Sequence, residues 1–328
     1  MAKNKFLYII IFFALAVYLV MGIYADFAKL VSTIEKFRWD FFILLLIFTT
    51  ISYVIRFIKW DFFLKRVGIR LNIRDNLFVF LSGFSMVMTP GKVGEVWKGW
   101  LIKDINGEKL NKTVPVVIMD RITDVMGLIF LSMLGIIYYM EGIYIIIVLL
   151  ILFSGFLIAV RSKTISGKII ILLEKRMGKY AENIKTMHAT FEILMKPGAL
   201  ISMSLLSAFA WFFECLVMYF AIIGFGQSIS ITLSTFIFSF ASLAGAVSMV
   251  PGGLGVAEGT ISGMLQYFGI APAVSVAITI IVRAVTLWYG TIIGLSVFFI
   301  FNKKIKRIGN QEIMKANDIG ETCQKSQY

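Results

Sequence analysis

The sequence predicts an all-α polytopic membrane protein with about six full spans and two re-entrant hairpins arranged as an inverted repeat. Of its 328 residues, 59% are hydrophobic, and apolar runs long enough to cross a bilayer recur along the chain. Two similar Pro-Gly motifs interrupt apolar segments in the two halves of the sequence. Because helices satisfy their own backbone hydrogen bonds inside a membrane, we expect the spanning segments to be helical.

Six apolar runs are the predicted full spans. Lys3 and Lys5 precede the first run, which is longer than the apolar part of a signal peptide, so we expect an uncleaved span. A loop is expected at residues 25–40 and a tight turn at residues 141–142. The six runs cover residues 6–24, 41–58, 114–140, 143–160, 199–224 and 273–301.

Basic residues predict how the chain is oriented in the cell membrane. The net charge is +13 at pH 7, which we interpret as topology rather than as a sign of nucleic-acid binding. One integral domain is expected over residues 1–301, with both termini cytoplasmic and a cytoplasmic tail at residues 302–328. The basic segment expected in the cytoplasm after the second run holds Arg56, Lys59, Lys65, Arg66, Arg70 and Arg74.

A further cytoplasmic loop is predicted at residues 161–197, where basic residues again outnumber acidic ones. Its stretch 168–194 has an apolar face and is expected to lie on the inner leaflet as an amphipathic segment. A solvated helical hairpin is the alternative for this loop.

The segment 247–259 breaks an apolar stretch late in the chain. It contains Pro251, which lacks a backbone donor, and three glycines that favour an irregular backbone: Gly252, Gly253 and Gly255. Irregular backbone at membrane depth must be buried in protein or line a polar cavity, and a carboxylate such as Glu258 needs a partner or a function there. We interpret the segment as a re-entrant hairpin whose tip lines a polar site. An ordinary turn outside the membrane is the alternative.

A similar motif follows residues 76–89, an apolar run of 14 residues that is too short to span comfortably. Basic residues on both sides indicate that this segment enters and leaves on the cytoplasmic side. Each motif is followed by an acid and then by an arginine, 31 or 32 residues after the proline. Because the second hairpin is expected to enter from the outer side, this match predicts an inverted repeat with halves at about 41–140 and 199–301. The first motif holds Pro90, Gly91, Gly94, Glu95 and the later Arg121, and the second holds Pro251, Gly252, Gly255, Glu258 and the later Arg283.

Arg121 and Arg283 are the first candidates for binding a ligand. Arginine stays charged and presents a planar fork that suits phosphate oxygens, so inside a span it needs an anion from the protein or from a ligand. Asp120 and Asp124 are candidate partners of Arg121, and a structural ion pair is the alternative to ligand binding. Arg283 has no acid in its own span, which leaves Glu258, Glu214 or a lipid phosphate as its anion.

Two further residues are candidates with open alternatives. Glu214 lies among aromatic residues and could carry a proton or pair with an arginine of another helix. Lys92 could hold a head-group phosphate or extend to the membrane surface. With one histidine and two distant cysteines, no metal site is expected, and no P-loop, zinc motif or nucleophile elbow occurs, so no cofactor is expected either.

Three segments, 89–95, 118–125 and 250–258, resemble the signatures of the flippase-like membrane domain of lysylphosphatidylglycerol synthetases, and Arg283 and Trp288 also fit. The resemblance covers residues 5–301. It implies paired re-entrant hairpins that move a lipid with a polar head across the bilayer. Asp120 stands where the family often has glutamate, a departure that keeps the charge. The synthetases carry a large soluble domain where this chain has a short tail, so synthetase activity is not expected.

The expected function is translocation of an anionic or phosphate-bearing lipid, such as a modified phospholipid or a polyprenyl-phosphate-linked sugar. A separate lipid-modifying enzyme would be a partner. An intramembrane enzyme that acts on a polyprenyl-phosphate lipid through Asp120 and Asp124 is one alternative, and an ion-coupled solute transporter is another. Arg121, Arg283 and Lys92 would bind the head group, while Asp120, Asp124, Glu95, Glu214 and Glu258 would balance charge or couple protons.

Overall fold

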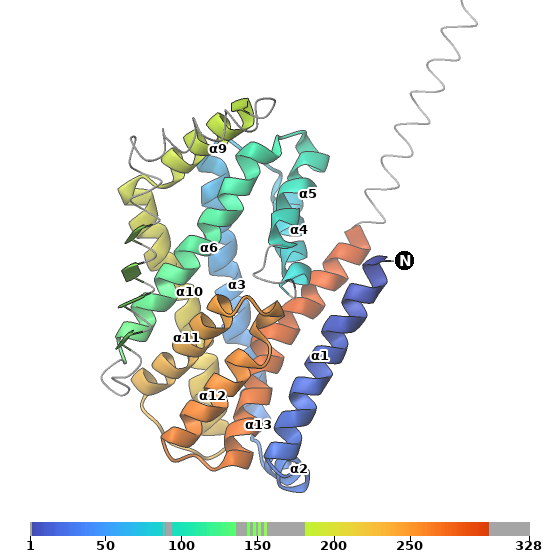
Figure 1. The fold of residues 1–328 in the computed structure, drawn as a ribbon, viewed down its shortest axis with the longest axis vertical. Coiled ribbons are helices and arrows are strands. Elements are labelled where there is room, and N and C mark those ends of the chain that lie inside the picture. Colours follow the sequence, from blue (N-terminus) through green and yellow to red (C-terminus); the bar gives the residue numbers. More distant parts are fainter. Residues whose placement is uncertain are drawn as a thin grey trace, which may run out of the picture.

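The computed structural model describes residues 2–87, 89, 94–135, 143–144, 147–148, 150–151, 154–155 and 181–301, with side chains from residue 12 onward. All regular secondary structure in these ranges is helical, and the helices form one elongated bundle (Figure 1). The predicted tight turn 141–142, the predicted tail 302–328 and most of the predicted span 143–160 lie outside the described ranges.

Three described helices are long and apolar enough to cross a membrane: α3 (Asp40–Arg66), α10 (Pro197–Gly224) and the continuous helix Pro272–Phe301. A bent pair adds a fourth candidate, because α1 (Ala2–Tyr24) and α2 (Phe27–Glu35) meet at 94° and pass the same test together. The described part of the chain therefore shows an all-helical membrane protein with three or four apolar candidate spans. The six spans counted from the sequence are not all represented there.

Residues 25–40, predicted to be a loop, contain the helix α2 in the structure. It forms because Leu30 turns inward and packs against Val276 and Ala277 of the last helix, so this segment has an apolar face of its own. The sharp bend before it occurs at Asp26, whose φ is 63°. The prediction of a loop relied on the balanced charges of residues 25–40 and did not consider the helical spacing of their apolar residues.

Two helical hairpins face one another across the middle of the bundle. The first consists of α4 (Ile73–Gly83), the short turn η1 (Phe84–Met86) and α5 (Trp97–Asn106). The second consists of α11 (Ile231–Val247), η6 (Pro251–Gly253) and α12 (Val256–Tyr267). Figure 1 shows the two hairpins lying toward opposite ends of the molecule. The second Pro-Gly motif, at Pro251–Gly253, therefore lies at the turn of a helical hairpin.

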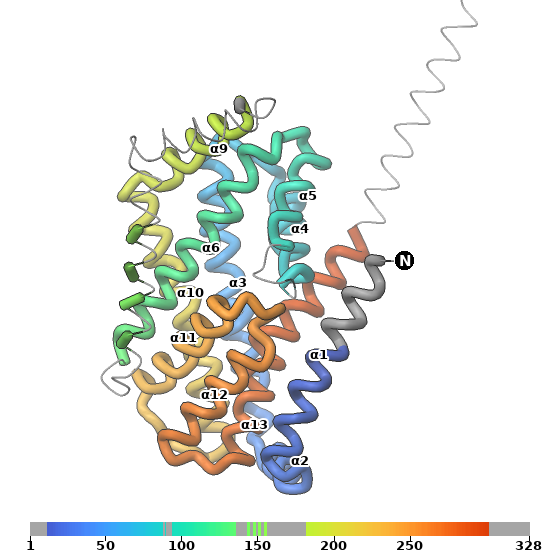
Figure 2. Tube along the Cα trace, in the orientation of Figure 1, coloured from blue at the N-terminus to red at the C-terminus, as the bar shows by residue number. Residues whose placement is uncertain are grey.

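The core has two apolar parts that are joined by α3. One surrounds Leu45 and contains residues of α6 (Leu110–Met133), α10 and α11. The other surrounds Trp60 and contains residues of α4, α5 and α6, while α9 (Ala181–Leu194) packs across α6 at that end (Figure 2). Between the two parts, α3 buries the polar residues Ser52 and Arg56. The polar level of the bundle thus lies between two apolar levels.

The last helix is not uniform along its length. It begins as α13 (Pro272–Arg283), continues through the π-helical turn η7 (Ala284–Trp288) and then runs as an α-helix to Phe301. π-helical turns occur frequently at functional sites, and this one begins directly after Arg283.

Candidate functional site

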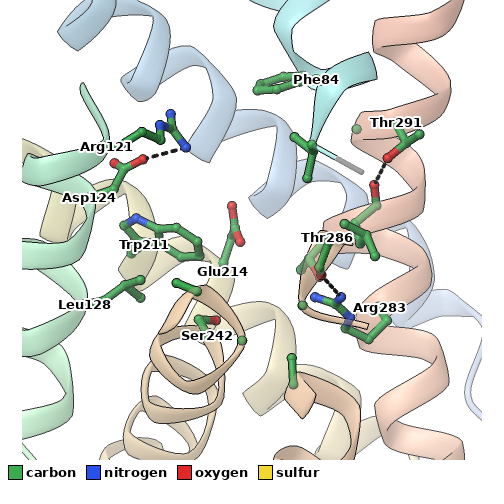
Figure 3. Close-up of a pocket in the computed structure, with 18 of the residues that line it drawn as sticks. Phe84, Arg121, Asp124, Leu128, Trp211, Glu214, Ser242, Arg283, Thr286 and Thr291 are labelled. Carbon is green, nitrogen blue, oxygen red and sulfur yellow. Dashed lines mark hydrogen bonds and ion pairs between the residues drawn. The ribbon is translucent and has the colours of Figure 1, made fainter. Parts of the chain in front are cut away.

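A cavity of about 250 Å³ lies at the polar level of the bundle, between the turns of the two hairpins. Figure 3 shows side chains of η1, α6, α10, α11 and the last helix converging on it, and residues of α3 complete the lining. One wall is apolar, and the other walls carry charges of both signs. The charged lining residues are Arg56, Glu95, Arg121, Asp124, Glu214 and Arg283.

Arg121 on α6 is surrounded by three carboxylates. Its guanidinium nitrogens lie 2.5 Å from Asp120 Oδ2, 3.1 Å from Asp124 Oδ2 and 3.4 Å from Glu95 Oε2. The side chain of Arg121 is 25% exposed, whereas the three acids are almost fully buried. The predicted pairing of Arg121 with Asp120 and Asp124 is confirmed, and Glu95 from the first hairpin joins them.

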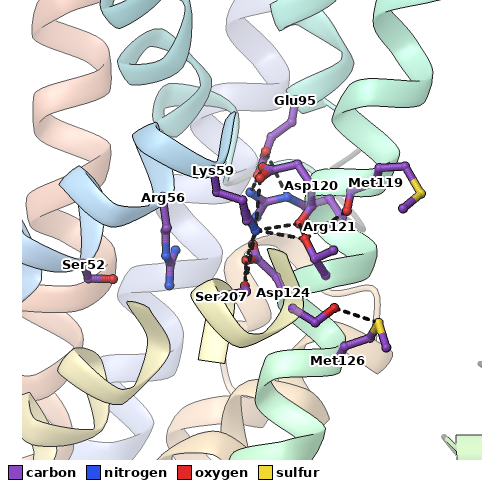
Figure 4. A network of polar contacts seen from close by, with 12 residues as sticks. Ser52, Arg56, Lys59, Glu95, Met119, Asp120, Arg121, Asp124, Met126 and Ser207 are labelled. Carbon is purple, nitrogen blue, oxygen red and sulfur yellow. Dashed lines mark hydrogen bonds and ion pairs between the residues drawn. The ribbon is translucent and has the colours of Figure 1, made fainter. Parts of the chain in front are cut away.

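Two lysines that the sequence did not single out as site residues complete this group, and Figure 4 shows one of them, Lys59, among the acids. Lys59 Nζ lies 2.5 Å from Asp124 Oδ1 and 3.1 Å from Asp120 Oδ1, and Lys98 Nζ lies 3.2 Å from Glu95 Oε2. Lys59 also donates to Ser207 Oγ at 3.3 Å. We call these six residues the Arg121 cluster: Lys59, Glu95, Lys98, Asp120, Arg121 and Asp124.

Glu214 on α10 has a separate cation. Arg56 of α3 donates to Glu214 Oε1 at 2.7 Å, and Ser52 donates to the same oxygen at 3.1 Å. The guanidinium of Arg56 also lies over the ring of Trp211, 4.0 Å from its centroid. Of the two roles predicted for Glu214, the structure shows the pairing with an arginine of another helix. That arginine is Arg56 and not Arg283.

Arg283 pairs with the second hairpin. Its Nε lies 2.7 Å from Glu258 Oε1, and its terminal nitrogen donates to the carbonyl of Gly252 at 2.7 Å. Glu258 is fully buried, and its other oxygen accepts the backbone N–H of Gly255 at 2.8 Å. Of the anions left open for Arg283 by the sequence, the structure shows Glu258.

The glycines of the second turn permit this contact. Gly252, Gly253 and Gly255 have φ of 62°, 65° and 81°, in the region that favours glycine. A Cβ on Gly253 would lie 3.1 Å from the Cα of Gly245, so the turn packs closely on α11. The resulting backbone points the Gly252 carbonyl toward Arg283.

The first turn is described only in part. Gly94 donates its backbone N–H to Thr89 Oγ1 at 2.8 Å, and Glu95 follows in the cluster. The predicted site residues Pro90, Gly91 and Lys92 lie outside the described residues.

The prediction that Arg56 and Lys59 belong to a cytoplasmic basic segment is wrong. The helix α3 continues to Arg66, so both residues lie inside it, and their side chains are at most 9% exposed. A signal for this was present, because Ser52, Arg56 and Lys59 are spaced i, i+4, i+7 and form one face of the helix. Counting basic residues for topology ignored that periodicity.

The apolar wall of the cavity is covered by α1. Ala14 of this helix packs against Val87 and Leu254 of the two hairpins and against Leu287 of the last helix. Tyr18 accepts a hydrogen bond from Trp288 Nε1 at 2.9 Å, which ties the same helix to the π-helical turn. Val87 and Leu287 also line the cavity, so α1 lies directly behind this wall.

Among the described residues, the charged side chains that line the cavity are three arginines and three acids, so their charges balance one another. Such a site can exchange a protein carboxylate for an anionic ligand group at an arginine. Within the described part of the chain, no group of three or more His, Cys, Asp or Glu residues could hold a metal ion.

Comparison with known proteins identifies one matching family. A family model described as the lysylphosphatidylglycerol synthase TM region matches residues 11–294. A UPF0104 membrane protein of Pyrococcus horikoshii is 25% identical over 329 residues, covering 91% of this chain and 98% of the relative. UPF0104 membrane proteins of Methanocaldococcus jannaschii and Methanothermobacter thermautotrophicus are 26% and 23% identical; they cover 66% and 80% of this chain, and 94% and 84% of their own lengths are matched.

Proposed function

The chain belongs to the lysylphosphatidylglycerol synthase transmembrane-region family, and from this premise we propose that it moves a phosphate-bearing lipid across the cell membrane. The head group would pass through the central cavity while the hydrocarbon tail stays in the bilayer. The observation that carries this proposal is the convergence of Arg56, Arg121 and Arg283 on one polar cavity within an apolar helical bundle.

A charged head group cannot enter about 30 Å of hydrocarbon without a replacement for its hydration. Arginines can supply it, because each presents several donors in the geometry of phosphate oxygens. Arg121 is the most exposed of the three, at 25%, against 12% for Arg283 and 9% for Arg56. Arg121 would therefore make the first contact with the phosphate.

The arrangement of the hairpins supports access from both sides. We propose that α4–α5 and α11–α12 are re-entrant, enter from opposite faces of the membrane and form the matching parts of an inverted repeat. In such a repeat, movement of one half against the other exposes a central site alternately. Both termini would lie in the cytoplasm, in agreement with the positive-inside rule.

The acids in and beside the cavity form ion pairs with lysines and arginines, and these ion pairs favour translocation over bond cleavage. Asp120 and Asp124, the pair that an intramembrane enzyme would use, both bind Lys59 and Arg121. Glu214 binds Arg56 and can exchange this cation for a proton or a ligand group during a cycle. We therefore assign the acids to charge balance.

Proteoliposomes test the proposal. A head-labelled polyprenyl-phosphate sugar and a head-labelled phospholipid are incorporated, and an impermeant quencher is added outside. We expect the wild type to speed the loss of protected fluorescence and Arg121→Gln to abolish the acceleration. The matched control is Arg38→Gln, because Arg38 pairs with Asp40 at an exposed position outside the cavity.

Two results would contradict the proposal. One is no acceleration of any phosphate-bearing lipid by folded wild-type protein. The other is an Arg121→Gln rate equal to that of the Arg38→Gln control.

A further inference from the structure

Arg121 has an unusual excess of acids around it for a residue that receives an anion. Glu95, Asp120 and Asp124 all lie within ion-pair distance of its guanidinium. With Arg121 as their sole cation, these three carboxylates would leave the group with two negative charges. A phosphate would then be repelled, because like charges interact unfavourably and strongly at short range inside a protein.

Lys59 and Lys98 cancel that excess. Their ammonium groups bind the same three acids, so the Arg121 cluster has three positive and three negative charges. Both lysine side chains are buried, at 0% and 1% exposure, and neither lines the cavity. The two lysines therefore bind the acids on the side away from the cavity, and Arg121 is the one cation of these three that faces the cavity.

The fold makes specific room for both lysines. The stem of Lys98 passes Gly83 of α4 so closely that a Cβ there would overlap it. Its ammonium lies 4.9 Å from the ring centroid of Trp60 and 5.4 Å from that of Phe80. Lys59 donates to the carbonyl of Asp120 at 3.0 Å and to Thr123 Oγ1 at 3.2 Å.

Buried lysines are costly at membrane depth, and a buried ion pair is a weak source of stability. A function beyond packing would explain the presence of two buried lysines, Lys59 and Lys98, next to Arg121. We propose that Lys59 and Lys98 are positioning residues that set the charge around Arg121, so that its guanidinium can accept a phosphate group. This inference rests on the proposed function and names residues that control affinity without touching the lipid.

A charge series tests it with two probes that differ only in the phosphate: tail-labelled polyprenyl phosphate and tail-labelled polyprenol of the same length. The protein is placed in nanodiscs of an uncharged lipid, and the ratio of the two dissociation constants is measured. Lys98→Met removes one positive charge, Glu95→Gln removes one negative charge, and the double variant restores the balance.

We expect Lys98→Met to reduce the preference for the phosphate probe about 10-fold, and Glu95→Gln to increase it. The double variant should return to within a few-fold of the wild-type ratio. Lys59→Met and Lys59→Met/Asp124→Asn form a second series with the same expected order. If Lys98→Met does not fold, the Glu95→Gln variant still tests whether the charge around Arg121 sets the preference for the phosphate probe, because that preference should then increase.

The outcomes separate the two proposals. A wild type that binds the phosphate and the alcohol equally well would refute phosphate recognition and this inference with it. A wild type that prefers the phosphate, with variants that weaken both probes alike, would leave the proposed function standing. In that case the lysines would have a structural role alone.

Discussion

The two hairpins use the same sequence pattern but surround their arginines differently. In each, an acid near the turn binds an arginine of the following helix: Glu95 with Arg121 and Glu258 with Arg283. Arg121 shares its acids with two lysines in a six-residue cluster. Arg283 has one carboxylate and the carbonyl of Gly252. We refer to the second arrangement as the Arg283 pair.

The difference separates two functions that a buried arginine can have. The Arg283 pair is self-contained and holds the second turn in place, because Glu258 also caps the start of α12 through Gly255. The Arg121 cluster spreads its charge over three helices and the first turn. The Arg283 pair stabilises the backbone of the second turn. The Arg121 cluster can lose a single contact and keep its remaining contacts.

The largest expected effect is on the Arg283 pair. Arg283→Met leaves Glu258 buried without its cation, which should lower the free energy of unfolding by about 3–5 kcal/mol. Thermal unfolding in detergent measures the loss. Glu258→Gln/Arg283→Met should recover much of it, and a double variant as unstable as the single one would show that the charge is not the cause.

The second effect is on the turn itself. Gly253→Ala should cost about 2–3 kcal/mol, because φ is 65° and the new Cβ would approach the backbone of Gly245. Gly94→Ala in the first turn should cost less, because Gly94 lacks the positive φ of Gly253 and its Cβ would meet a side chain, that of Thr89, rather than backbone. Unfolding midpoints of both variants compare the two turns, and an equal loss would contradict the assigned difference.

A smaller effect is expected for Arg121→Met, about 1–2 kcal/mol, because Lys59 and Lys98 still compensate the acids. The same unfolding experiment applies, with Arg38→Met as the exposed control. A loss of unfolding free energy as large as that of Arg283→Met would contradict the proposed difference between the Arg121 cluster and the Arg283 pair.

The smallest effect concerns α1, which contacts the second hairpin and the π-helical turn through Tyr18 and Trp288. Tyr18→Phe removes one hydrogen bond and should cost about 1 kcal/mol. Hydrogen exchange should increase in residues 248–255 and stay unchanged in α5. Faster exchange in both regions would show that α1 supports the whole bundle.

Much of the fold was predictable from hydrophobicity and from breaks in it. The runs at residues 41–58 and 199–224 are confirmed within α3 and α10, and the second Pro-Gly motif lies at the turn of a hairpin. The pairs Arg121–Asp124 and Arg283–Glu258 were predictable because a buried arginine needs an anion. The family suggested by the motifs is confirmed by the family match.

The cations of α3 and α5 were not predictable by the same reasoning. Arg56 and Lys59 follow an apolar run and count as topology signals unless helical periodicity is examined across the boundary of that run. Lys98 lies in a lysine-rich stretch, and its burial depends on a contact with Gly83 that sequence spacing does not reveal. The acids that Arg56 and Lys59 bind are distant in the sequence, and although Lys98 binds the nearby Glu95, its burial also depends on tertiary packing.

The π-helical turn after Arg283 makes the last helix sensitive to its exact length. An extra residue in one turn fixes the rotational setting of everything that follows, including Gly290 beside the Tyr53 hydroxyl and Gly294 against the backbone of Ser85. Deleting a single residue at Ala284–Trp288 would remove the extra residue and let the turn close as an ordinary α-helical turn, whereas inserting another residue there would rotate the remainder of the helix by about 100° and turn both glycines away from those neighbours. In this segment, an insertion should therefore be far less tolerated than a deletion or a conservative substitution.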